Sequence, residues 1–149
     1  MTILRLYVAG TPRPQPRPRF VNGRAVSTAS RAAKVWSDRV RIEAICTNEH
    51  IATACGVHLT FHFPTKDKAR WGKPHTCRPD KDNCEKLILD SLVKAGVLAD
   101  DSLVAEGFTR KQWAQSGGVE ILVYDPAVGP PIDDDVGAVE IVDNVDGAA

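Results

Sequence analysis

Alternating apolar and polar side chains predict four β-strands, at residues 2–9, 56–64, 103–113 and 119–124. The clearest is 56–64, where one face is apolar and the other is polar. The apolar face consists of Val57, Leu59, Phe61 and Phe63, and the opposite face of His58, Thr60 and His62. At this spacing we interpret the two histidines as structural residues rather than metal ligands.

A helical period predicts two helices. The first can be capped by Ser27, Thr28 or Ser30 and runs to about residue 49. Its expected apolar face is Ala32, Val35, Trp36, Val40, Ile42, Ala44 and Ile45. The second covers residues 83–94, with Asp82 as its N-cap and Gly96 just beyond its end. Its expected buried stripe is Leu87, Ile88, Leu92 and Val93.

Proline and glycine mark the connecting segments. Residues 10–19 contain four prolines, which predict an extended loop that carries arginines. Asn22-Gly23 between two short apolar stretches indicates a hairpin turn. Residues 65–79 form a polar loop, and the Trp71 side chain within it can either stack on an unpaired base or anchor the loop.

Charge divides the chain into two parts. The formal net charge is zero, but residues 125–149 hold seven acids and no Lys or Arg, which leaves 19 basic and 12 acidic residues in 1–124. We therefore expect one folded domain, residues 1–124, and a flexible acidic tail, residues 125–149. A basic body favours a nucleic-acid partner, and a solvated basic face is the alternative.

Composition narrows the class of protein further. The hydrophobic fraction of 43% and charged fraction of 26% are those of a globular domain, and no apolar run is long enough for a membrane span. Four cysteines without CxxC spacing predict free thiols in a reducing compartment rather than disulfides or a zinc site.

A dense acidic cluster carries the candidate chemistry. Asp80 and Asp82 are followed by Asn83 and Lys86, and the pair Asp100-Asp101 follows the predicted helix. Grouped carboxylates repel one another unless a cation lies between them, and Mg²⁺ is bound through one or two carboxylates and substrate phosphates. Helix capping and surface charge are the simpler interpretation of these acids, and Lys86 can also pair with Asp82 or Asp90.

This arrangement resembles the RusA-type Holliday junction resolvases. The resemblance covers about residues 2–124. It is carried by the proline–arginine loop Pro12 to Arg19, the D-x-D-N-x-x-K run from Asp80 to Lys86, the helix end Leu92 to Val97, and the Asp100-Asp101 pair with Val104. One departure is Pro79, which occupies a position where the family tends to carry a basic residue.

The resemblance implies an α+β fold: a single small domain with a mixed β-sheet, on which two main helices pack. It also implies a homodimer that nicks four-way DNA junctions in pairs with Mg²⁺, or Mn²⁺ as a substitute, in the cytoplasm of a bacterial or phage-infected cell. The implied catalytic residues are Asp80, Asp82, Asp101 and Lys86, and the three aspartates are the implied metal ligands, with Asn83 and Asp100 as secondary candidates. The expected DNA contacts are Arg13, Arg17, Arg19, Lys66, Lys68, Arg70, Lys73 and Arg78.

Three other functions are compatible with these residues. A non-catalytic protein that binds junctions or single strands needs the basic loops but not the carboxylates. A nuclease that acts on flaps or forks needs the same cluster and the same basic face. A structural or regulatory domain needs neither a metal nor DNA. The acidic tail can either compete with DNA for the basic face or only improve solubility.

Overall fold

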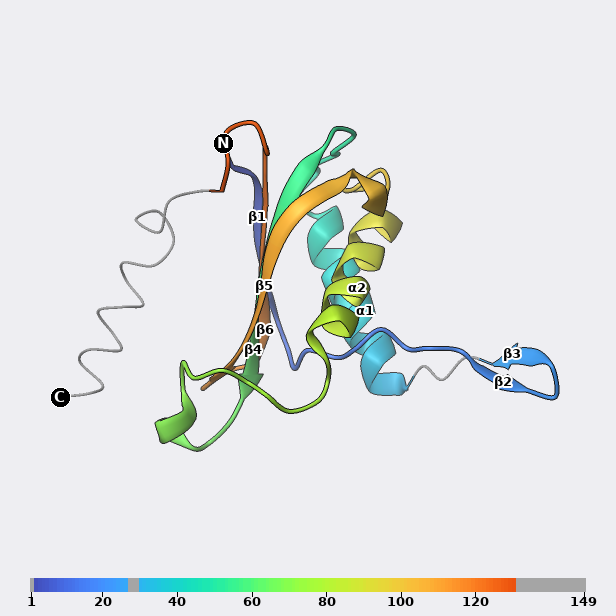
Figure 1. Ribbon diagram of the computed structural model, residues 1–149, viewed down its shortest axis with the longest axis vertical. Helices are drawn as coiled ribbons and strands as arrows, with labels where there is room; N and C mark the ends of the chain where they lie inside the picture. Colours follow the sequence, from blue (N-terminus) through green and yellow to red (C-terminus); the bar gives the residue numbers. More distant parts are fainter. Residues whose placement is uncertain (1, 27–29, 131–149) are drawn as a thin grey trace.

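The computed structural model describes residues 2–26 and 30–130 (Figure 1). In chain order the elements are β1 (Thr2–Ala9), β2 (Arg19–Val21), β3 (Arg24–Val26), α1 (Arg31–Ile45), β4 (Cys55–Pro64), the 3₁₀ turn η1 (Lys68–Arg70), α2 (Lys81–Lys94), the 3₁₀ turn η2 (Asp101–Leu103), β5 (Val104–Ala114) and β6 (Gly118–Tyr124). All predicted strands are present, and Leu103, which was expected to begin a strand, belongs to η2 instead.

Four strands form one mixed sheet, in the order β1-β6-β4-β5. β6 pairs antiparallel with both β1 and β4, whereas β4 and β5 are parallel and are connected through α2. Both helices lie on the same side of this sheet (Figure 1). The α+β architecture with a mixed sheet and two main helices is therefore confirmed.

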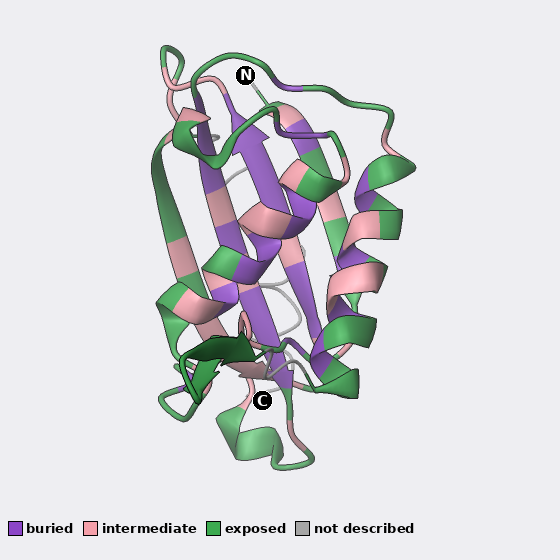
Figure 2. Cartoon of the chain, turned by 90° about the vertical axis from the view of Figure 1, so that its right-hand side faces the viewer, coloured by how far each residue is buried: buried purple, intermediate pink, exposed green. Residues whose placement is uncertain are grey.

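The core lies between the sheet and the helices. Seen from the helix side, buried residues run along the strands beneath both helices (Figure 2). Leu59 and Phe61 of β4 are fully buried there. On the other face of β4, His62 Nδ1 lies 3.2 Å from the Gln112 side-chain amide, and the His58 ring lies edge-on to that of Tyr124. Both histidines pack against other side chains of the sheet, in agreement with a structural role.

α1 begins where its cap predicts but ends earlier than expected. The Ser30 hydroxyl accepts a hydrogen bond from the Ala33 amide, and the other two candidate caps, residues 27 and 28, lie outside the described residues. The helix ends at Ile45 because the Thr47 hydroxyl donates a hydrogen bond to the Ala44 carbonyl and Asn48 adopts a positive φ of 57°.

The buried face of α1 is narrower than the sequence predicted. Its buried residues are Ala33, Trp36, Val40 and Ala44. The expected core positions Ala32, Val35, Ile42 and Ile45 are exposed instead. This difference arises because α1 covers the edge of the sheet and contacts it through a single stripe of side chains.

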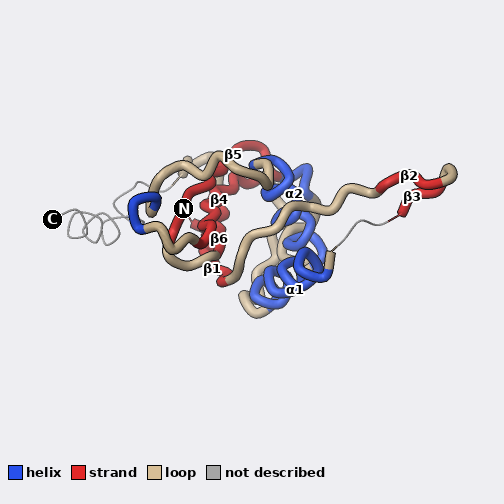
Figure 3. The backbone as a smooth tube through the Cα atoms, turned by 90° about the horizontal axis from the view of Figure 1, so that it is seen from below, coloured by secondary structure: helices blue, strands red, loops and turns tan. Residues whose placement is uncertain are grey.

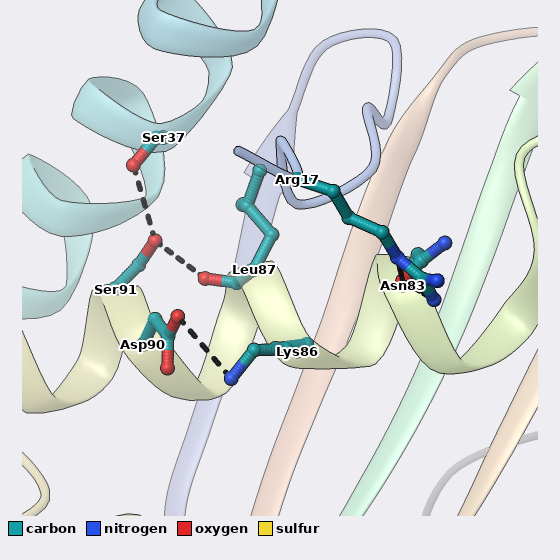
Figure 4. A network of polar contacts seen from close by, with 7 residues as sticks. All are labelled: Arg17, Ser37, Asn83, Lys86, Leu87, Asp90 and Ser91. Atoms are coloured by element: carbon teal, nitrogen blue, oxygen red, sulfur yellow. Dashed lines mark hydrogen bonds and ion pairs between the residues drawn. The ribbon is translucent and has the colours of Figure 1, made fainter. Parts of the chain in front are cut away.

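α2 begins two residues before the predicted start. Asp80 is its N-cap, which moves Asp82 from the predicted cap position into the first helical turn. Cys84, Leu87, Ile88 and Leu92 are buried against the sheet. The buried Ser91 hydroxyl donates to the Leu87 carbonyl (2.7 Å) and lies 3.4 Å from the Ser37 hydroxyl of α1 (Figure 4).

The loop that precedes α2 is packed onto β5. The His75 ring stacks on Phe63 with a centroid distance of 3.9 Å and also contacts Trp113. The Trp113 amide donates to the Lys73 carbonyl. The Trp71 indole donates to the Thr65 carbonyl at 2.9 Å, which supports the interpretation that Trp71 anchors the loop.

Within the described residues, neither helix is long and apolar enough to cross a membrane. The four cysteines, all within these residues, are free thiols. Asp125 starts a turn in which its carboxylate accepts from the Ala127 amide at 2.9 Å. The predicted acidic tail lies outside the described residues from residue 131 onward.

The buried His75 ring predicts a pH-dependent stability. Burial, followed by the nearby Lys111 ammonium, lowers the pKa of His75 below its ordinary 6.5. The unfolded chain then binds a proton more readily, so the free energy of unfolding falls as the pH drops below about 6.5. His75→Phe keeps an aromatic ring in the stack and removes the titration, so urea unfolding at several pH values should show a weaker pH dependence.

Burial also lowers the pKa of His58, so some pH dependence should remain in the His75→Phe variant. A slope identical to that of the unmodified protein would contradict a contribution from His75.

Candidate metal and nucleic-acid site

The N-terminal end of α2 presents two exposed carboxylates. Asp80 occupies the N-cap position, yet its side chain makes no capping hydrogen bond. The Asp82 carboxylate accepts from the Asn83 amide at 3.0 Å. Both side chains lie near the positive end of the helix dipole, which stabilises negative charge. The Asp80 carboxylate is therefore not used in a capping hydrogen bond, and it is available to bind a cation.

Lys86 lies one turn further along α2 than Asp82. Its ammonium is 3.8 Å from the Asp90 carboxylate, and its side chain is 60% exposed (Figure 4). An exposed i,i+4 pair of this kind contributes only about 0.3–0.5 kcal/mol. Lys86 can therefore exchange Asp90 for an incoming phosphate at little cost.

The proline–arginine loop is attached to the same end of α2. The Arg17 guanidinium donates to Asn83 Oδ1 from Nε (3.2 Å) and from Nη2 (2.8 Å), as Figure 4 shows. The Gln15 amide donates to the Asn83 carbonyl at 3.0 Å. Asn83 thus uses both its side chain and its backbone to hold the loop beside Asp82.

A residue missed in the sequence analysis, Lys111 of β5, holds the segment on the other side. Its ammonium donates to the carbonyls of Cys77 (2.8 Å) and Pro79 (2.6 Å), just before Asp80. The Arg78–Pro79 bond in this segment is cis. Lys111 pairs with Phe61 and so falls on the helix-facing side of β5, where an apolar residue is expected; this position follows from the strand register and not from a local pattern in the sequence.

The two basic segments consequently flank the two carboxylates. Figure 1 shows the proline–arginine loop and the loop 65–79 in the half of the molecule where α2 begins. All eight predicted DNA contacts have exposed side chains: Arg13, Arg17, Arg19, Lys66, Lys68, Arg70, Lys73 and Arg78. A cleft of about 240 Å³ adjoins this end of α2, between Lys81, Glu85 and residues 104–109 of β5.

Asp100 and Asp101 lie elsewhere. They follow the C-terminal end of α2, next to a segment in which the Ala99 amide donates to the Ile51 carbonyl. The 14 residues of α2 span about 20 Å, so this pair and Asp82 occupy opposite ends of the helix. Asp100 caps η2 by accepting from the Ser102 amide at 2.8 Å, and hydrogen bonds to Ser102 and then to Asp101 lower its pKa.

A single chain therefore does not gather the predicted metal ligands Asp80, Asp82 and Asp101. Among residues 2–26 and 30–130 there is no group of three or more His, Cys, Asp or Glu side chains able to hold a metal ion. Asp80 and Asp82 nevertheless fit Mg²⁺, because this ion commonly takes one or two carboxylates and completes its shell with substrate phosphates and water.

Cys84 is a buried residue of α2 whose pKa is affected by the charges of the two acids. Burial first, and then the charges of Asp80 and Asp82, raise the pKa of Cys84 to about 11, although Lys111 acts in the opposite direction. The thiol is thus protonated at neutral pH and cannot serve as a nucleophile. The reactive chemistry of this site belongs to the exposed carboxylates and the lysine.

Lys111 predicts a measurable loss of order. Lys111→Met keeps much of the side-chain volume but removes the donor to the Cys77 and Pro79 carbonyls. Such charged hydrogen bonds contribute about 1.5–3 kcal/mol, so urea unfolding should show a loss of that size. Hydrogen exchange should increase at the amides of residues 76–80, excluding proline.

Lys34→Met, which replaces an exposed lysine on α1, is the matched control and should leave both measurements unchanged. Equal effects of the two substitutions would show that Lys111 does not order this segment.

Comparison with known proteins adds one finding. A family model described as "Endodeoxyribonuclease RusA" matches residues 9–124, a range that includes the acids, Lys111 and both basic loops. No curated protein is similar enough to the chain to count as a match.

Proposed function

The chain belongs to the RusA endodeoxyribonuclease family, and from this premise we propose that it is a Mg²⁺-dependent enzyme that resolves four-way DNA junctions. The reaction is the hydrolysis of two phosphodiester bonds at symmetric positions, with Mn²⁺ as a substitute ion. The site of action is the cytoplasm of a bacterial or phage-infected cell.

One observation carries this proposal: two carboxylates free to bind a cation lie between two basic loops. Asp80 and Asp82 lie at the start of α2, Arg17 is fixed on one side by Asn83, and Lys111 fixes the loop on the other. A DNA backbone that follows the arginines and lysines would bring a phosphate to these acids. Backbone contacts of this kind position DNA without reading its sequence.

The acids, Lys86 and Arg17 would have different roles in hydrolysis. When bound, Mg²⁺ supplies Lewis-acid polarisation of the scissile phosphate and lowers the pKa of water. Asp80 and Asp82 would hold it. Lys86, released from Asp90, would place its ammonium against the charge that develops on the phosphate oxygens. Arg17, which is fixed by its hydrogen bonds to Asn83, would help to position the DNA strand beside the acids.

We further propose that two copies act together as a C₂ dimer. A four-way junction is cut twice, and a twofold dimer presents two equivalent sites to it. The position of Asp101 at the far end of α2 supports this arrangement, because a chain cannot bring Asp101 to its own Asp82 in the folded form described above. Each site would then combine Asp80 and Asp82 of one subunit with Asp101 of the partner subunit.

The proposed activity predicts metal-dependent, structure-specific nicking. The unmodified protein should cut a labelled four-way junction at symmetric positions in Mg²⁺ and leave a linear duplex of the same sequence intact. Asp82→Asn should reduce the rate at least about 100-fold while junction binding persists, since it removes a metal ligand and not a DNA contact. Denaturing gels and gel-shift titrations measure the two quantities.

Asp38→Asn, at an acid on α1 that pairs with Arg41, is the matched control and should cut normally. Binding without cutting in either metal would leave a DNA-binding module in place of a nuclease. Equal cutting of the duplex would remove the junction specificity, and a preference for forks or flaps would redirect the substrate.

The shared site predicts complementation between two inactive variants. In a mixed dimer of Asp82→Asn and Asp101→Asn, one site carries both substitutions and the other carries neither. Co-refolding the two variants should therefore restore single nicks at about a quarter of the normal rate, since half of the dimers are mixed and each has one intact site. If all three aspartates acted within one chain, the mixture would stay inactive.

A further inference from the structure

Among residues 2–26 and 30–130, the β2–β3 hairpin is not packed against the sheet or the helices. All six residues of the two strands are exposed, and they include Phe20 (78%), Val21 (53%) and Val26 (46%). Figures 1 and 3 show the hairpin projecting away from the sheet and the helices. An isolated two-stranded hairpin is marginally stable in water, and exposed phenylalanine adds to the cost. The exposed apolar side chains of the hairpin are therefore available for contact with a partner.

The two faces of the hairpin differ in chemistry. The pairing Phe20↔Ala25 puts the aromatic ring on one face. The pairs Arg19↔Val26 and Val21↔Arg24 put both arginines on the other face. The Asn22-Gly23 turn, with φ values of 51° and 76°, joins the strands tightly and holds this division.

Charge selects the class of partner. The first 26 residues contain five arginines and no acid, so the segment attracts polyanions and repels a second copy of itself. Aromatic side chains beside arginines are the combination with which proteins bind nucleic acids that have accessible base faces. An exposed ring can stack only on a base whose face is accessible, and a branch point offers such faces where its arms unstack, whereas the inside of a regular duplex does not.

The root of the hairpin is fixed beside the acids. Arg17, two residues before β2, is bound to Asn83, and Asn83 adjoins Asp82 in the chain. Phe20 is three residues further along, a reach of about 10 Å in extended chain. Successive phosphates of a DNA strand lie about 3.4 Å apart along the axis, so the ring falls about three nucleotides from a phosphate held at the acids.

We propose that Phe20 stacks on an exposed base face at the branch point of the DNA while Arg19 and Arg24 hold the flanking phosphates. This inference rests on the proposed function and adds to it how the site distinguishes branched from linear DNA. The acids select a phosphate, and the hairpin requires an opened base step at a fixed distance from that phosphate. Cutting is then confined to branch points because a continuous duplex offers the ring nothing to stack on.

The test uses the full chain with Asp82→Asn, which separates binding from cutting. A four-way junction carries 2-aminopurine at the branch point, and its fluorescence rises when that base is unstacked. The parent should raise the signal. Adding Phe20→Ala should abolish the rise and weaken junction binding about tenfold, the effect of losing one stacked base, with linear-duplex affinity unchanged. Phe20→Trp should retain the junction affinity, because an indole ring also stacks on a base face.

Ile42→Ala removes an exposed apolar side chain from α1 and is the matched control, expected to change nothing. Unchanged junction affinity and fluorescence in Phe20→Ala would overturn the inference, as would an equal loss on linear duplex. Conversion of a dimer to a monomer by Phe20→Ala in sedimentation would assign the hairpin to subunit contact instead.

Cleavage by the chain without Asp82→Asn is recorded in parallel. Nicking that continues at the branch point in Phe20→Ala would leave the proposed function standing and remove the role of the hairpin. A fluorescence response without any nicking by the unmodified chain would support the role of the hairpin in binding and remove the proposed nuclease function.

Discussion

The burial of one side of α2 against the sheet is the constraint on which the acidic site depends. Cys84, Leu87, Ile88 and Leu92 are almost wholly buried, and they fix the rotation of the helix. With that side committed to the core, the first turn must present Asp82 and Lys86 to solvent. The same hydrophobic contact thus stabilises the fold and aims the charged side chains.

Polar contacts then connect loops that the hydrophobic core does not order. Asn83 holds the proline–arginine loop, and Lys111 holds the segment that leads into Asp80. In both contacts a charged side chain, Arg17 or Lys111, donates to an uncharged oxygen. Such a hydrogen bond orders a loop without neutralising a carboxylate. The acids stay exposed while the chain around them is fixed, and the basic side chains of both loops lie on the surface beside them.

The arrangement also separates stability from function. The carboxylates at the start of α2 lie near the positive end of the helix dipole, and a bound cation would stabilise their charge further. The exposed hairpin likewise gains nothing from the core. The proposed binding of metal and DNA would account for both features, because binding sites often depart from what stability alone favours.

The sequence alone determined the strands, the existence of both helices, and the candidate acids, because alternation, helical period and charge density are local properties of the chain. It misjudged which residues of α1 are buried, since the width of a helix contact depends on the position of the helix over the sheet. It also placed the N-cap of α2 at Asp82 rather than Asp80, because either acid satisfies the same local rule.

Tertiary structure alone decided which charged groups meet. Lys111 reaches the Cys77 and Pro79 carbonyls only because β5 runs beside the loop, and Arg17 reaches Asn83 only because the proline-rich loop crosses the start of α2. It also separated Asp101 from Asp82 by the length of a helix, although both belong to one motif in the sequence. Distances of this kind depend on how the elements pack against one another, and no local pattern encodes them.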